Sequence, residues 1–184
     1  MSSFSVKEHK SASYAPRTYH NTTTADLTAA FAVDFTTVGE KLTKKAANGK
    51  YVAIDTNMEP IEAARELYKG CRKFDVKVLN VAGNGIYTYY KNGHDQQSLN
   101  HYVYDVISLV GQHWPLKGII SGGQSGVDLA GGVVAKYLGI PCEMTYPKGF
   151  KMRFEDGRDV EMSEKEVLTL VDQWVNILQS DLDA

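Results

Sequence analysis

The chain has 184 residues, of which 43% are hydrophobic and 23% are charged, and 20 Lys and Arg residues against 22 Asp and Glu residues give a formal net charge of -2. This composition is typical of a globular protein with a sizeable core, and it excludes wholesale disorder and fibrous architectures. Because a near-neutral chain has no overall attraction for nucleic acid or for an anionic membrane, neither is expected as a partner.

The two cysteines, Cys71 and Cys142, are too few for a disulfide framework, and each lies in or beside an apolar segment. A reduced chain in a reducing compartment explains them most simply. The sequence has no run of about 18 apolar residues, and its N-terminus lacks the pattern of a secretion signal. We therefore expect a cytoplasmic protein.

The first 73 residues carry the weaker structural pattern. Residues 1–25 are rich in Ser, Thr, Tyr and Lys without apolar periodicity, which predicts a flexible N-terminal arm. Residues 26–73 are predicted to form a mostly helical extension, in which Thr37–Glu40 and Thr56–Glu59 have the spacing of capping boxes. The extension is expected to form one compact unit with residues 74–184.

Residues 74–184 alternate between apolar runs and helical patterns. The runs at 76–82, 117–121 and 141–146 predict buried strands that are parallel neighbours in one sheet. Apolar residues at helical spacing after each run predict helices, and Ser163–Glu166 forms a capping box before the last of them. The predicted fold class is α/β, a Rossmann-like parallel sheet with helices on both faces.

Glycine-rich turns follow the first two of these strands. Gly83 and Gly85 lie in the first turn, and Gly122, Gly123 and Gly126 lie in the second. Ligands of open parallel sheets bind beyond the carboxyl ends of the strands, where glycines let the backbone approach an anion closely. The pair of turns predicts a shared phosphate-sized crevice, although glycines that only make tight turns remain an alternative. Neither turn has the residues of a P-loop or of a dinucleotide fingerprint.

Polar and aromatic side chains around these turns complete the predicted site. Asp128 can accept hydrogen bonds from a ligand, or it can be a helix N-terminal acid favoured by the helix dipole. Lys148, Lys151 and Arg153 can close over an anion or only face water, and Tyr87 can stack on a ring or pack in the core. The predicted ligand-binding residues are Gly83, Asn84, Gly85, Tyr87, Ser121, Gly122, Gly123, Gln124, Ser125, Gly126, Asp128, Lys148 and Arg153.

The segment Ser121–Asp128, which reads SGGQSGVD, resembles the SGGQ(S/T)G(A/V)D signature of the molybdenum carrier family within the SLOG superfamily. Pro147–Gly149 and Glu155–Gly157 are similar to later stretches of that family, and Ala82–Tyr87 is similar to a turn of a neighbouring SLOG branch. The resemblance covers roughly residues 76–178. It implies a Rossmann-like fold, a homo-oligomer, and a ligand that is a nucleotide, a nucleotide-derived signal or a molybdopterin-type compound.

Two functions are consistent with these features. The first is a carrier or sensor that binds a small phosphorylated nucleotide-like ligand. The alternative is a hydrolase that cleaves an N-glycosidic or phosphoester bond of a nucleotide, with Asp128 or Glu155 as the acid/base. The identity of the ligand and of any cofactor stays open. No metal site is expected, because His94 and His101 lack the further ligands that such a site needs.

Overall fold

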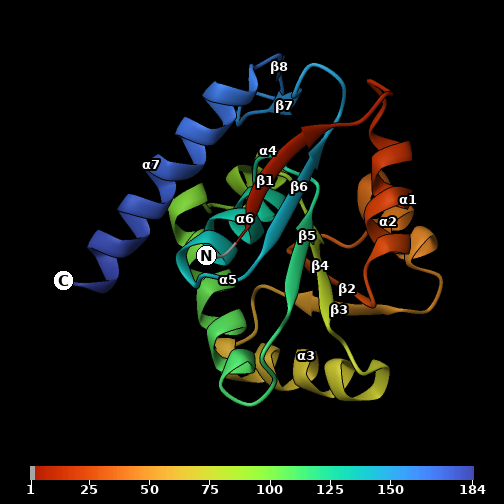
Figure 1. Cartoon of the computed structure of the whole chain (residues 1–184), viewed down its shortest axis with the longest axis vertical. Coiled ribbons are helices and arrows are strands. Elements are labelled where there is room, and N and C mark those ends of the chain that lie inside the picture. The colour runs from red at the N-terminus through yellow and green to blue at the C-terminus, as the bar shows by residue number, and fades with distance from the viewer. Residues whose placement is uncertain (1–2) are drawn as a thin grey trace.

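A six-stranded parallel sheet forms the centre of the computed structural model, which describes residues 3–184 (Figure 1). Its strands lie in the order β1-β6-β5-β4-β2-β3, and every neighbouring pair is parallel. The strands are β1 (Phe4–Glu8), β2 (Leu27–Ala32), β3 (Tyr51–Asp55), β4 (Val78–Gly83), β5 (Gly118–Ser121) and β6 (Cys142–Tyr146).

Helices cover both faces of this sheet. Helices α1 and α2 pack against each other on one face, whereas α3, α5, α6 and α7 follow one another in contact on the opposite face (Figure 1). A short antiparallel hairpin, β7 (Met152–Arg153) and β8 (Asp159–Val160), precedes the last helix. The helices are α1 (Tyr14–Thr24), α2 (Val38–Ala47), α3 (Pro60–Phe74), α4 (Ile86–Lys91), α5 (Gln96–Gly111), α6 (Val127–Tyr137) and α7 (Glu164–Leu182).

The predicted α/β class and strand arrangement are confirmed. The three expected strands are β4, β5 and β6, and they are parallel neighbours in the predicted order. The capping box before α7 is also present, with Ser163 accepting from the N–H of Glu166 and the Glu166 carboxylate accepting from the N–H of Ser163. The apolar periodicity of residues 74–184 was sufficient for these predictions because local spacing decides which faces are buried.

The N-terminal third differs from its prediction. Within the expected arm, whose residues 1–2 lie outside the described part, residues 4–8 form the edge strand β1 and residues 14–24 form α1. The expected helical extension contains two strands, β2 and β3, and all six residues of β2 are buried. Three of those six residues are alanines, which favour helices, so only pairing with β3 and β4 makes this segment a strand.

Strand β1 occupies an unusual place for the first strand of a chain. It pairs with β6, beside the last long helix α7, and α1 then leads the chain to β2 near the other end of the sheet. If β1 followed α7 in the sequence instead, the strand order would become 2-1-3-4-5-6, the doubly wound order of flavodoxin-like sheets with one added strand. The chain therefore has the connectivity of a circularly permuted doubly wound fold.

Candidate functional site

A cavity of about 390 Å³ lies between α1, α2 and the carboxyl ends of β4 and β5. The cavity lies where β2 and β4 are neighbours in the sheet. The helices that follow these two strands lie on opposite faces of the sheet, and doubly wound sheets bind ligands at such a point. The lining residues include Tyr14, Arg17, Thr18 and Asn21 of α1, Thr37–Glu40, Leu42 and Thr43 around α2, Asn80 and Ala82–Thr88 from β4 onwards, and Gly122, Gln124, Asp128 and Arg153.

The alternation of side chains along β4 creates the polar side of this cavity. Asn80 and Ala82 line the cavity, whereas Leu79 and Val81 belong to the apolar core. Successive residues of a strand point to opposite faces of the sheet, so one strand supplies both the core and the site. Asn80 donates from its Nδ2 to the Thr28 Oγ1 of neighbouring β2 at 3.1 Å.

A buried ion pair joins the first helix to the second glycine turn. Arg17 Nη1 lies 2.9 Å from Asp128 Oδ2, and their side chains are only 10% and 7% exposed. Burial raises the pKa of Asp128, an effect that the Arg17 guanidinium opposes. Gly122 is required beside this pair, because a Cβ there would lie 1.4 Å from Arg17 Nη1 and 2.2 Å from Asp128 Oδ2.

The rest of the second turn is held mainly by internal contacts. A Cβ on Gly123, whose φ is +74°, would lie 2.3 Å from the Tyr146 ring. The N–H of Gly126 donates to Gln96 Oε1 at 2.7 Å, and the N–H of Ser125 donates to Gln124 Oε1 at 3.2 Å. These two N–H groups are therefore already bonded, and the glycines are explained first by close packing.

The first turn approaches the neighbouring strand closely. A Cβ on Gly83 would lie 1.8 Å from the carbonyl oxygen of Phe31, so only glycine fits there. The Asn84 side chain accepts from the N–H groups of Val33 and Asp34 and donates to the Asp34 carbonyl, each at 2.9 Å. Asn84 lines the cavity, but its side-chain bonds hold the loop after β2.

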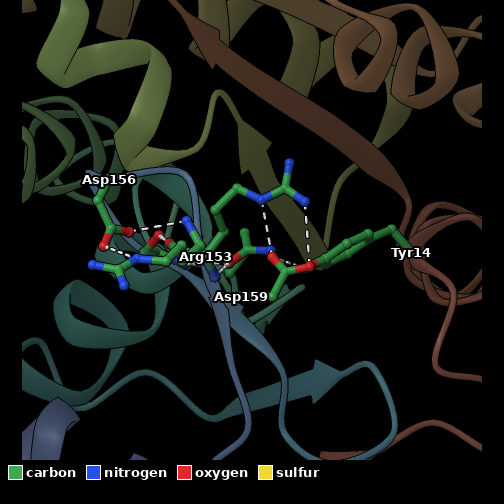
Figure 2. Close-up of polar contacts among 7 residues, drawn as sticks. Tyr14, Arg153, Asp156 and Asp159 are labelled. Atoms are coloured by element: carbon green, nitrogen blue, oxygen red, sulfur yellow. Dashed lines mark hydrogen bonds and ion pairs between the residues drawn. The ribbon is translucent and has the colours of Figure 1, made fainter.

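Figure 2 shows the polar contacts at the exposed end of the cavity, where the β7–β8 hairpin meets α1. Asp159 accepts from Arg153 Nε at 2.9 Å, from Arg153 Nη2 at 3.2 Å and from the Tyr14 hydroxyl at 3.0 Å. The backbone of Arg153 is also held, because its N–H donates to Gln124 Oε1 at 2.6 Å and its carbonyl accepts from the Ser125 hydroxyl. The hairpin is therefore fixed beside the cavity. The charge of Arg153, which lines the cavity, is partly balanced by the Asp159 carboxylate.

The structure brings most of the predicted ligand-binding residues to the cavity, but not all of them. Gly83, Asn84, Gly85, Tyr87, Gly122, Gln124, Asp128 and Arg153 line it. Ser121 is fully buried and donates to the Asp128 carbonyl, and Lys148 is exposed and lies outside the lining. Glu155, the second predicted acid/base, is exposed and also lies outside the lining.

Sequence reasoning missed four buried polar residues of the site. Within residues 3–184, four lining side chains carry a buried atom without a hydrogen-bond partner: Arg17 Nε, Asn21 Oδ1, Glu40 Oε2 and Asn80 Oδ1. The capping-box spacing of Glu40 explained this residue without any role in a site. Its N–H does donate to Thr37 Oγ1 at 3.2 Å, but its carboxyl is only 3% exposed and lines the cavity. The four-residue spacing of Arg17 and Asn21 was the available signal that one helical face carries both.

Glu40 has the only carboxyl among these four groups. Burial, supported by the nearby charge of Asp128, raises the pKa of Glu40 to about 7, while a hydrogen bond with Tyr51 opposes the shift. Such a group changes its charge near neutral pH and can accept or donate a hydrogen bond accordingly.

No group of three or more His, Cys, Asp or Glu side chains in residues 3–184 is arranged to hold a metal ion. His101 instead pairs with Asp181 at 2.8 Å, and the His94 ring packs on Tyr89. The same residues include no helix that is long and apolar enough to cross a membrane.

The fold and the position of the cavity define a doubly wound Rossmann-like protein with a site at the switch point of its sheet. Residues 1–88 match the model of the circularly permutated YpsA SLOG family, in agreement with the displaced position of β1. This match supports assignment to the SLOG superfamily. No curated protein and no solved structure matches it. Most of the matched residues precede the part of the chain that carries the resemblance in its motifs.

Proposed function

We propose that this protein binds a small phosphorylated nucleotide-like ligand in the α1–α2 cavity, as a carrier or a sensor. The observation that carries the proposal is that four residues lining one cavity, Arg17, Asn21, Glu40 and Asn80, each have a buried polar atom without a hydrogen-bond partner. An unpartnered buried polar group costs about 1–3 kcal/mol, and a polar ligand would remove that cost.

The size and composition of the cavity support a ligand of this class. Its volume of about 390 Å³ lies within the usual range of small-molecule sites. The exposed end carries the Arg153 guanidinium and the half-exposed Tyr87 ring, which suit a phosphate and a sugar or base respectively. The match to a SLOG family model is consistent with a nucleotide-related ligand. A molybdopterin-type compound also carries a phosphate and a ring with N–H groups.

The alternative function is hydrolysis of an N-glycosidic or phosphoester bond, and Glu40 is the observation that favours it. A carboxyl whose pKa is about 7 is suited to exchange a proton at neutral pH. Asp128, in contrast, is engaged with Arg17, and Glu155 lies outside the cavity. Glu40 therefore replaces both as the candidate acid/base.

Calorimetric titration with a panel of nucleoside monophosphates tests the proposal. Val38 lines the cavity yet is 85% exposed, so Val38→Trp should block the entrance without disturbing the core. The matched control is Ile61→Trp, a 46% exposed position on α3, on the other face of the sheet. We expect saturable binding by the wild type and the control, and binding weakened at least about tenfold by Val38→Trp.

Chromatography of the incubated nucleotides separates the two functions. Unchanged ligand supports the carrier or sensor, whereas a released base or phosphate supports the hydrolase. Absence of saturable binding by every nucleotide of the panel, or equal binding by Val38→Trp and the wild type, would overturn the proposed site.

A further inference from the structure

Three of the four unpartnered atoms are oxygens, and they come from three different elements of the cavity wall. Asn21 of α1, Glu40 of α2 and Asn80 of β4 are each 2–3% exposed, and each leaves one side-chain oxygen without a partner within residues 3–184. They are buried parts of the cavity wall, whereas Val38 and Arg153, which also line the cavity, are exposed. We call these three residues the acceptor floor.

The protein's own contacts leave these oxygens as acceptors. The Asn80 amide donates through Nδ2 to Thr28 Oγ1, and the Oδ1 of Asn80 takes no part in that bond. The carboxyl of Glu40 has only acceptor oxygens when it is ionised. Arg17, the nearest cation in the cavity, directs its Nη1 to Asp128 rather than to the floor. The floor therefore needs hydrogen-bond donors, and several of them close together.

We propose that the acceptor floor selects ligands whose buried ring carries an exocyclic amino group beside a ring N–H or a second amino hydrogen, such as the edge of an aminopurine. This inference rests on the proposed function and names the part of the ligand that the acceptor floor recognises. Among base edges, adenine, cytosine and guanine present amino donors, whereas hypoxanthine has the shape of guanine without the 2-amino group. Arg17 Nε, the donor among the four unpartnered atoms of the cavity residues, suits a ring nitrogen or carbonyl of the same base.

The charge of Glu40 makes this recognition dependent on pH. The ionisable groups around Glu40 include Arg17 on α1, Asp128 on α6, Tyr51 on β3 and Tyr89 on α4, and Lys44 of its own helix lies over the Tyr51 ring at 6.0 Å. The facing parts of β2 and β4 supply the neutral side chains Thr28 and Asn80. Because the pKa of Glu40 is about 7, its ionised fraction rises about tenfold between pH 6 and pH 8. A donor-rich edge bonds the ionised form, so binding should tighten as the pH rises.

Paired nucleotides that differ only in the amino group test this inference. Calorimetric titrations compare guanosine monophosphate with inosine monophosphate, and adenosine monophosphate with purine riboside monophosphate, at pH 6, 7 and 8. We expect the amino-bearing member of at least one pair to bind about ten- to hundredfold more tightly at pH 8, as for hydrogen bonds to a charged group. The ratio within that pair should fall about tenfold at pH 6. Using the ratio removes the titration of the phosphate, which both members share.

Glu40→Gln keeps the shape of the side chain and removes its charge. It should reduce the preference for the amino-bearing nucleotide to less than about threefold and abolish its pH dependence. The control is Glu62→Gln, an exposed acid in the first turn of α3, which should change neither.

The possible outcomes separate this inference from the proposed function. Saturable binding with no preference for amino groups at any pH would overturn the acceptor floor and leave the cavity as a nucleotide site. A preference that strengthens as the pH falls would also overturn it, because Glu40 would then bind as a protonated donor. Absence of binding by all four nucleotides would overturn the proposed function and this inference with it.

Discussion

Removing the Arg17 guanidinium should destabilise the fold strongly, because it leaves a buried carboxylate unpaired. Arg17→Met keeps a similar stem without the charge. The side chains of Arg17 and Asp128 are 10% and 7% exposed and 2.9 Å apart, so they form a buried ion pair. Removing one partner of a buried ion pair lowers the free energy of unfolding by about 3–5 kcal/mol. For a chain of this length, that loss corresponds to a decrease in Tm of about 6–20 °C.

The loss should depend on pH in a direction that follows from Asp128. Burial raises the pKa of Asp128 from its ordinary value of 3.8, and without Arg17 only a backbone hydrogen bond with Gln124 opposes the increase. An acid whose folded pKa is raised penalises folding above its unfolded pKa and imposes no penalty below it. The destabilisation by Arg17→Met should therefore be largest at about pH 7.5 and shrink towards about pH 4.

Urea unfolding of the ligand-free protein at both pH values measures these free energies. Adding Asp128→Asn to Arg17→Met should recover part of the loss at pH 7.5, because the uncompensated charge is gone. The control is Arg65→Met, an exposed position on α3, which should stay within about 0.5 kcal/mol of the wild type. A loss below about 1 kcal/mol at pH 7.5, or an equal loss at both pH values, would refute the role assigned to the ion pair.

Three further predictions concern the turn, the floor and the assembly. Gly123→Ala should lower the Tm of the ligand-free protein, because its Cβ would lie 2.3 Å from the Tyr146 ring and its φ is +74°. A thermal scan that matches the wild type would contradict this prediction. Glu40→Gln should stabilise the ligand-free protein by up to about 3 kcal/mol at pH 8 and by little near pH 4.5, since the folded pKa of Glu40 is about 7; urea titrations that show no such trend would contradict the burial of an ionised carboxylate. Light scattering at micromolar concentration should show a species larger than the 20.4 kDa monomer, and a clean monomer would leave the expected homo-oligomer without support.

The sequence by itself determined the part of the fold whose elements have strong local patterns. The strands β4, β5 and β6 and the helices between them were predictable, because apolar spacing shows which side of each element is buried. The glycine turns after β4 and β5 were expected to approach a ligand closely, whereas the close approach in the structure is to the protein's own atoms. At Gly83 and Gly122 a Cβ would lie within 2 Å of a neighbouring atom.

The tertiary structure alone decided what those turns contact and where the site lies. Strand β1 and the alanine-rich β2 are strands only because β6, β3 and β4 supply their hydrogen bonds, and no local pattern contains that information. The cavity brings together Arg17, Glu40 and Asp128, which are separated by up to 111 positions in the sequence. Glu40 has the spacing of an ordinary capping residue, and only the packing of α1 and α2 over the sheet removes its carboxyl from water and raises its pKa.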